Sequence, residues 1–144
     1  MFATLLKSTF VSLVLTGAAS AASFDIHMKN KGADGAMVFE PAFVAAAAGD
    51  TINFISDDKG HNVETIKGML PEGAEPLKSK MSEAYTVTLT VEGLYGIKCT
   101  PHFALGMVAL IQVGKPVNLD AASAVEQKGK AKTRFEPLFA AVVK

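Results

Sequence analysis

Four residues with metal-binding side chains lie in two separate segments of the sequence. Cys99, His102 and Met107 form one short segment, with two residues between Cys and His and four between His and Met. His61 lies far upstream, directly before Asn62. Together they offer one thiolate, two imidazoles and one thioether, a donor set that suits both copper(I) and copper(II). The sequence therefore predicts one copper ion per chain, in a fold that brings His61 to the Cys-His-Met loop (residues 99–107).

Each of these residues has a common structural role when it occurs alone, because Cys and Met often fill cores and a His is often a satisfied polar group. Other Cys-His chemistries fit less well. A structural zinc site needs four ligands from Cys, His or carboxylates, and Met is a poor zinc ligand. A cysteine protease needs a base and an oxyanion hole that this loop does not specifically indicate. An internal disulfide is excluded because Cys99 is the only cysteine.

The first 21 residues are predicted to be a signal peptide. Lys7 is basic, residues 10–15 are mostly apolar, and small residues end at Ala21, so cleavage is expected between Ala21 and Ala22. The apolar stretch is too short to span a membrane. We expect a soluble, exported domain of residues 22–144. In an oxidising compartment its single thiol is a hazard unless it is buried or bound to metal.

Charge and composition fit one globular domain. The chain has 14 basic and 14 acidic residues, a balance that gives no indication of nucleic-acid binding. Hydrophobic residues make up 49% of the 144 residues, enough for a proper core.

The pattern after the signal peptide predicts short strands separated by turns. Residues 85–91 alternate most cleanly, with Tyr85, Val87, Leu89 and Val91 on one face. Further strands are expected at 24–28, 37–41, 51–55, 94–98 and 108–113. Such strands are typical of an antiparallel sandwich or barrel. A long connection with one helical turn is expected between His61 and Tyr85.

The periodicity changes after residue 116 and predicts two C-terminal helices that pack on the sandwich. Apolar residues of the first fall at helical spacing from Leu119 to Val125, after Asn118 as a cap. The second is expected to start near Glu136, with Pro137 in its first position.

Several segments resemble the cupredoxins, the blue-copper protein family, and within it the pseudoazurins. The resemblance lies in Gly-Ala-Met-Val-Phe-Glu-Pro-Ala at 35–42, Lys-Gly-His-Asn-Val-Glu at 59–64, Pro-Glu-Gly-Ala-Glu at 71–75 and Cys-Thr-Pro-His at 99–102. It implies an all-β fold, an eight-stranded Greek-key sandwich with two C-terminal α-helices. The loop spacing differs from those of azurins and amicyanins, and plastocyanins lack the helical tail. Multicopper oxidases flank the Cys with histidines, whereas here its neighbours are Lys98 and Thr100.

The resemblance also implies roles for the candidate site residues. His61, Cys99 and His102 would be equatorial copper ligands and Met107 the axial one. Asn62 would give its backbone N–H to the Cys99 sulfur and tie the two loops together through its side chain.

Three further residues lie outside this ligand set. Met37 would lie near the His102 ring, although plain core packing is the slightly favoured alternative. Pro101 has no N–H and so cannot donate a hydrogen bond to the adjacent thiolate. His27, in the first strand, is interpreted as a structural or surface histidine.

The same loop offers a surface for a redox partner. His102 is expected to be the ligand nearest to solvent, beside the apolar residues 103–106, which include Leu105, with Pro41 and Pro101 extending the patch. Lysines that match the basic ring of pseudoazurins are Lys31, Lys59, Lys78 and Lys98, with Lys80 nearby. Ordinary solvated charge is the alternative for each. The resemblance implies a copper-containing nitrite reductase as partner.

The sequence as a whole indicates a monomeric periplasmic electron shuttle that catalyses no reaction by itself. A copper delivery or storage protein uses the same soft donors but exchanges its metal readily, and it remains the main alternative. An enzyme is the third possibility.

Overall fold

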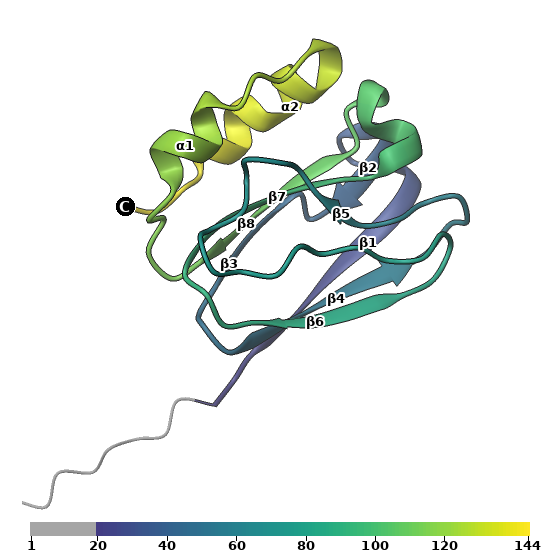
Figure 1. Ribbon diagram of the computed structural model, residues 1–144. Coiled ribbons are helices and arrows are strands. Elements are labelled where there is room, and N and C mark those ends of the chain that lie inside the picture. The colour runs from purple at the N-terminus through teal and green to yellow at the C-terminus, as the bar shows by residue number, and fades with distance from the viewer. Residues whose placement is uncertain (1–19) are drawn as a thin grey trace, which may run out of the picture.

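The computed structural model describes residues 20–144, which form two four-stranded sheets with two helices at the C-terminal end (Figure 1). The first sheet has the order β2-β1-β4-β6 and the second β3-β8-β7-β5. The strands are β1 (Ser23–Gly32), β2 (Gly35–Glu40), β3 (Phe43–Ala46), β4 (Asp50–Ser56), β5 (Glu64–Thr65), β6 (Tyr85–Leu89), β7 (Gly93–Lys98) and β8 (Val108–Val113). The helices are η1 (Thr100–Leu105, a 3₁₀-helix), α1 (Leu119–Ala124) and α2 (Gly129–Ala140). The predicted signal peptide falls almost wholly on residues 1–19, which lie outside the described residues.

The eight-stranded sandwich is confirmed, but the expectation of antiparallel pairing is wrong for two of its strand pairs. β1 pairs with β4 in parallel, with Ile26 opposite Phe54, and β3 pairs with β8 in parallel. Parallel neighbours need a crossover, and the chain makes one by passing through β3 of the second sheet before it returns as β4. Period-2 alternation is the same in parallel and antiparallel strands, so the sequence pattern does not distinguish them.

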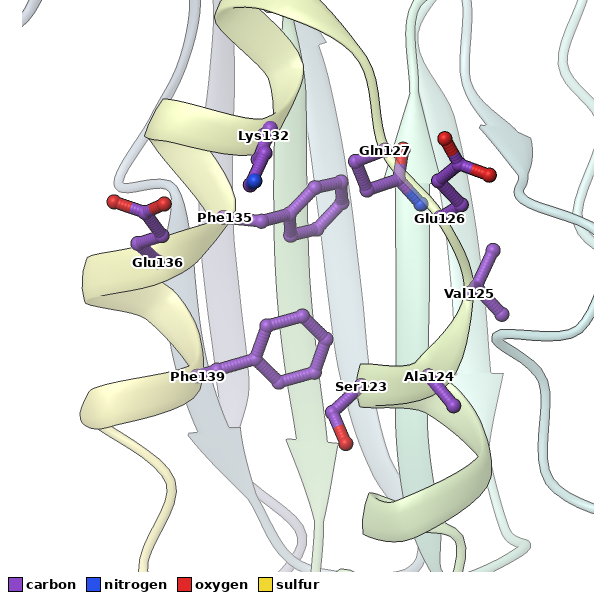
Figure 2. A pocket seen from close by; sticks show the side chains of 9 residues that line it. All are labelled: Ser123, Ala124, Val125, Glu126, Gln127, Lys132, Phe135, Glu136 and Phe139. Carbon is purple, nitrogen blue, oxygen red and sulfur yellow. The ribbon is translucent and has the colours of Figure 1, made fainter.

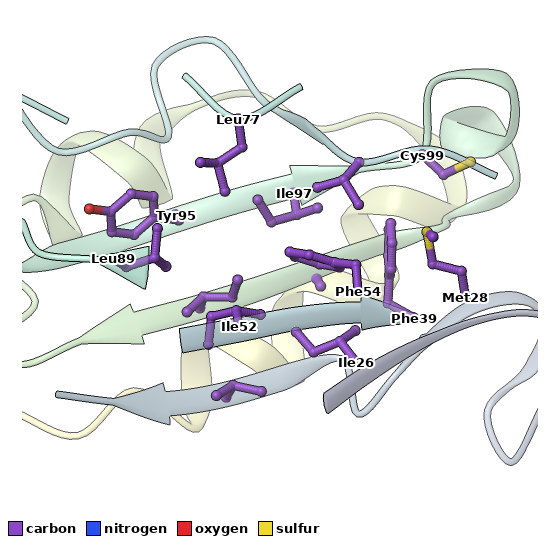
Figure 3. Packing of buried hydrophobic residues seen from close by; sticks show 14 of the residues in the cluster. Ile26, Met28, Phe39, Ile52, Phe54, Leu77, Leu89, Tyr95, Ile97 and Cys99 are labelled. Atoms are coloured by element: carbon purple, nitrogen blue, oxygen red, sulfur yellow. The ribbon is translucent and has the colours of Figure 1, made fainter. Parts of the chain in front are cut away.

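Alternating apolar side chains of the two sheets meet in one core (Figure 3). Ile26, Ile52 and Phe54 point inward from the first sheet, and Ile97 from the second. The buried Tyr95 hydroxyl donates to the Val91 carbonyl at 2.7 Å, so its burial leaves no unpaired donor. Cys99 belongs to this same cluster, at one end of it. The candidate site therefore adjoins the hydrophobic core directly.

The helices cover the outer face of the second sheet, where α1 contacts β7 and α2 contacts β8 (Figure 1). α2 begins at Gly129, so the start predicted near Glu136 is wrong. Buried Ala131, Phe135 and Leu138 recur at helical spacing, which extends the apolar stripe one turn and more before Pro137. Pro137 itself is exposed and lies inside α2, so the helix lacks the hydrogen bond that an N–H at this position would donate to the Thr133 carbonyl.

Asn118 precedes α1 as predicted, but its side chain makes no capping bond to the helix. It instead accepts from the Leu94 N–H at 2.7 Å and donates to the Leu94 carbonyl at 2.9 Å. This pair of bonds fixes the start of α1 to β7. The predicted helical turn between His61 and Tyr85 is also wrong, since residues 62–84, all of them described, contain β5, a bridge from Lys78 to Glu64, turns and irregular backbone, but no helix.

A groove of about 360 Å³ runs between α1 and α2, with Phe135 and Phe139 on one wall and Val125 on the other (Figure 2). None of the four candidate metal-binding residues lines it. Among residues 20–144, no helix is long and apolar enough to cross a membrane.

Phe54→Ala is expected to lower the free energy of unfolding of the metal-free protein by about 3–5 kcal/mol, because it leaves a cavity in the core between the sheets. Phe54 packs edge-on against Phe39, with ring centroids 6.0 Å apart. Urea unfolding measures the change. Thr90→Ala, at an exposed position, is the control and should shift the value by less than about 0.5 kcal/mol. A loss below about 1 kcal/mol for Phe54→Ala would contradict the packing described.

Candidate metal centre

The ends of β7 and β8 position the Cys-His-Met loop. The two strands are antiparallel, with Lys98 opposite Val108, so the intervening residues must turn back sharply. The Cys99 N–H donates to the Met107 carbonyl at 3.0 Å, and the Met107 N–H donates to the His102 carbonyl at 3.1 Å. Gly106 completes the turn at φ +83°, a conformation that favours glycine. The loop is thus held by its own backbone.

His61, Cys99 and His102 bring three donor atoms together at the end of the core. His61 Nδ1 lies 3.1 Å from His102 Nδ1 and 3.8 Å from Cys99 Sγ, and His102 Nδ1 lies 3.5 Å from Cys99 Sγ. The point equidistant from the corners of such a triangle lies about 2.0 Å from each donor atom. Bonds of a first-row metal to imidazole and thiolate are about 2.0–2.3 Å long. The three side chains therefore fit one metal ion without rearrangement.

Asn30 orients the His61 ring by a contact at Nε2, the ring nitrogen that does not face the other two donor atoms. His61 Nε2 lies 3.0 Å from the Asn30 amide oxygen, which only accepts hydrogen bonds, so Nε2 carries the proton and donates. Nδ1 is then the nitrogen with the free lone pair, and it faces the other two donors. Asn30 in turn is fixed through its backbone N–H, which donates to Asp58 Oδ2 at 2.7 Å.

Burial keeps both His61 and Cys99 in their uncharged forms when no metal is bound. Desolvation lowers the pKa of His61, and the neighbouring His102 lowers it further, while Asp58 opposes the shift. Burial raises the pKa of the Cys99 thiol, against the backbone N–H groups of Asn62 and His102, which lower it. A coordinated metal supplies the charge that deprotonates such a thiol. The site therefore suits a cation that binds imidazole and thiolate.

Asn62 joins the two loops. Its side-chain oxygen accepts from the Thr100 N–H at 2.7 Å, and its side-chain nitrogen donates to Thr100 Oγ1 at 3.0 Å. Thr100 Oγ1 donates onward to Glu64 at 2.7 Å, a bond that is the main reason the pKa of Glu64 is lowered. The Asn62 backbone N–H lowers the pKa of the Cys99 thiol, in opposition to burial. The side-chain link expected of Asn62 is therefore present, while its N–H bond to the Cys99 sulfur stays a prediction.

The other residues singled out in the sequence occupy varied positions. Met107 is fully buried, and its backbone bonds tie it to Cys99 and His102. Pro101 is exposed in the first turn of η1. Met37 packs against the core from β2 with φ +52°. His27 is half-buried, with Nδ1 2.8 Å from Asp57 Oδ1.

His61 is fully buried, whereas His102 is partly exposed, so His102 is the histidine nearer to solvent, as expected. Beside His102, Leu105 exposes 50% of its surface. The remaining residues of the predicted docking surface differ in exposure. Lys31, Lys59, Lys78 and Lys80 are exposed. Lys98 is half-buried, with Nζ 3.8 Å from Glu64 Oε1 and 5.5 Å from the centre of the Phe103 ring.

Sequence reasoning missed Asn30 and Glu64. Asn30 lies 31 positions before His61, and Glu64 lies 36 positions before Thr100, so their contacts depend on how β1, β5 and β7 come together. An Asn near the end of a strand or a Glu in a short one gives no local signal of either contact.

Comparison with known proteins agrees with this geometry. Residues 26–114 match the family described as copper binding proteins, plastocyanin/azurin family. The chain belongs to this family. It is 56% identical over 131 residues to the pseudoazurin of Paracoccus pantotrophus, a match that covers 90% of each chain. It is 45% identical over 133 residues to the pseudoazurin of Methylorubrum extorquens, covering 92% of this chain and 90% of that protein.

Solved structures show the same fold. The pseudoazurin crystal structure from Methylobacterium extorquens AM1 superposes with a TM-score of 0.80 at 47% identity, covering 82% of this chain and 97% of that one. The pseudoazurin structure from Hyphomicrobium denitrificans gives 0.81 at 44% identity, covering 85% and 99%. These matches confirm the predicted cupredoxin fold and copper as cofactor. The chain is a blue-copper electron-transfer protein of the pseudoazurin type.

In the metal-free protein, the free energy of unfolding is expected to fall as pH falls from about 7.5 to about 5.5. The folded-state pKa of His61 lies below its ordinary 6.5, so in this range the unfolded chain binds a proton that the folded chain does not. Protons then favour unfolding. Urea titrations across this range measure the slope, and His61→Gln should flatten it. A wild-type slope of zero or of opposite sign would contradict a His61 kept neutral by burial.

Proposed function

We propose that this protein carries single electrons through one copper ion held by His61 Nδ1, Cys99 Sγ and His102 Nδ1, with Met107 as a weak axial donor. The observation that supports this most is the triangle of three donor atoms with sides of 3.1, 3.5 and 3.8 Å. Copper bound by two imidazoles, a thiolate and a distant thioether accepts and releases one electron in nearly the same geometry.

The residues around the donors serve to hold that geometry. Asn30 fixes the ring of His61, and Asn62 fixes the two loops against each other. Neither the thiol nor His61 is charged without metal, so the empty site is stable in a buried position. No cleft is needed for a substrate, and the protein acts as a carrier that catalyses no reaction by itself.

The exposed edge of His102 is the proposed point of electron entry and exit. His61 is closed off from solvent, whereas His102 is partly exposed beside Phe103, Ala104 and Leu105. An apolar contact centred on these residues would bring a partner's redox centre close to the imidazole while excluding water. The exposed lysines Lys31, Lys59 and Lys78 would then steer an acidic partner and mainly raise the association rate.

The proposed setting is the periplasm, after removal of residues 1–21, with the mature protein a monomer. A copper-containing nitrite reductase is the proposed electron acceptor. The predicted signal peptide supports the periplasmic setting, and the resemblance to pseudoazurins supports the choice of electron acceptor.

Cys99→Ser is expected to abolish the intense visible band of the copper-loaded protein, because that band arises from charge transfer from the thiolate. Met107→Gln should keep the band and lower the reduction potential, since an oxygen donor favours copper(II) more than a thioether does. Visible spectroscopy and voltammetry measure both. A wild-type protein that binds copper without the band, or that loses copper readily to a chelator, would instead indicate copper delivery or storage.

Electron transfer to purified copper-containing nitrite reductase should slow as salt rises, since the Debye length is about 8 Å at physiological ionic strength. Lys59→Ala and Lys78→Ala should lower the association rate and flatten its salt dependence, with the potential unchanged. Leu105→Glu should weaken the complex at every salt concentration. Lys115→Ala is the matched control, because this exposed lysine follows the far end of β8. Stopped-flow rates equal to wild type in both lysine variants would contradict electrostatic steering.

A further inference from the structure

Arg134 reaches from α2 to four backbone carbonyls on two other segments. Its Nη1 donates to the Met37 carbonyl at 2.6 Å and to the Gly106 carbonyl at 2.9 Å. Its Nη2 donates to the Ala36 carbonyl at 2.8 Å and to the Asp34 carbonyl at 3.4 Å. A guanidinium suits this role because it presents five N–H donors in a rigid planar fork and accepts no hydrogen bonds.

The bond to Gly106 acts on the position of Met107. The Gly106 carbonyl and the Met107 N–H belong to one planar peptide unit, which moves as a body. Arg134 binds this unit at its oxygen, and the His102 carbonyl accepts from its N–H at 3.1 Å. With both polar groups held, the backbone of Met107 is fixed relative to His102.

The packing of α2 supports the same arrangement. A Cβ atom at Gly106 would lie 3.0 Å from Arg134 Cδ and 3.1 Å from the Lys130 carbonyl carbon, so the helix lies directly on the turn. On the other side, Met37 has φ +52°, a conformation unfavourable for a residue with a side chain. A charge-assisted hydrogen bond to its carbonyl helps to stabilise that conformation.

We propose that Arg134 is a positioning residue for the copper site: it clamps the Gly106–Met107 peptide between α2 and the start of β2, and thereby fixes the axial Met107 relative to His102. This inference rests on the proposed function in that it takes Met107 as the axial ligand. It assigns the C-terminal helix a part in the metal centre, in addition to covering the sheet.

Two measurements test it, the first on the metal-free protein. Arg134→Gln should speed amide hydrogen exchange at Gly106 and Met107 about tenfold or more relative to Ile52, since losing a hydrogen bond to a charged group costs about 1.5–3 kcal/mol. Arg134→Lys keeps the charge but not the fork, and should show the same local effect at smaller size. Arg134→Lys decides the result if Arg134→Gln is too unstable to purify.

The second measurement uses the copper-loaded protein. Both Arg134 variants should shift the visible charge-transfer band and the electron paramagnetic resonance spectrum, because the axial interaction changes. Lys132→Gln removes a charge two positions away on α2 and should leave both spectra unchanged. Leu89→Ala destabilises the core from β6 without touching the loop, and should likewise leave the spectra unchanged.

The inference would be overturned if both Arg134 variants had the same exchange rates and spectra as Lys132→Gln. It would also be overturned if Leu89→Ala shifted the spectra as much as the Arg134 variants do. A wild-type protein without the visible band would overturn the proposed function instead. The exchange measurement on the metal-free protein would still decide whether Arg134 clamps the peptide.

Discussion

The metal centre depends on the paired hydrogen bonds between the Asn62 amide and Thr100. The donor atoms come from loops 38 positions apart in the chain, and these two bonds, with the pairing of Glu64 and Lys98 in β5 and β7, set how the loops meet. Ordering two flexible loops costs conformational entropy, and in this protein the loops are ordered when the chain folds, before the metal binds. Metal binding therefore finds the three donors already in place. A carrier that alternates between two oxidation states benefits because little has to move when the electron arrives.

The hydrophobic core contributes to the same rigidity. Cys99 lies in one cluster with Met28, Phe39 and Ile97, so close packing holds its side chain on the core side, and its own carbonyl accepts from the His102 N–H at 3.2 Å. A thiolate alone would be costly in such surroundings, and the raised pKa of the thiol expresses that cost. A bound cation removes the cost, because it neutralises the thiolate where solvent does not. The apolar surroundings thus favour the metal-bound state over a free thiolate.

Local patterns in the sequence were sufficient for the donor spacing, for most of the strands and for the presence of two C-terminal helices. They failed where the outcome depends on distant residues. The β1–β4 and β3–β8 pairs are parallel because the chain crosses between the two sheets before it forms the second strand of each pair. α2 starts at Gly129 because its apolar stripe of Ala131, Phe135 and Leu138 packs against the outer face of β8. The expected start near Glu136 was based on Pro137 instead. The contacts of Asn30, Glu64 and Arg134 with the site likewise link segments far apart in the chain.

The four lysines of the predicted docking ring are not equivalent in the structure. Lys98 is half-buried, with its ammonium group 3.8 Å from Glu64 Oε1 and above the Phe103 ring, so a carboxylate already faces its charge. Glu64 is itself held ionised chiefly by Thr100, the residue that Asn62 binds. Lys98 therefore belongs to the network that joins the two loops, and its replacement would disturb the metal centre as well as the surface. In the proposed complex, steering would then rest on the exposed Lys31, Lys59 and Lys78, while Lys98 would act mainly by supporting the Phe103 ring at the edge of the apolar contact.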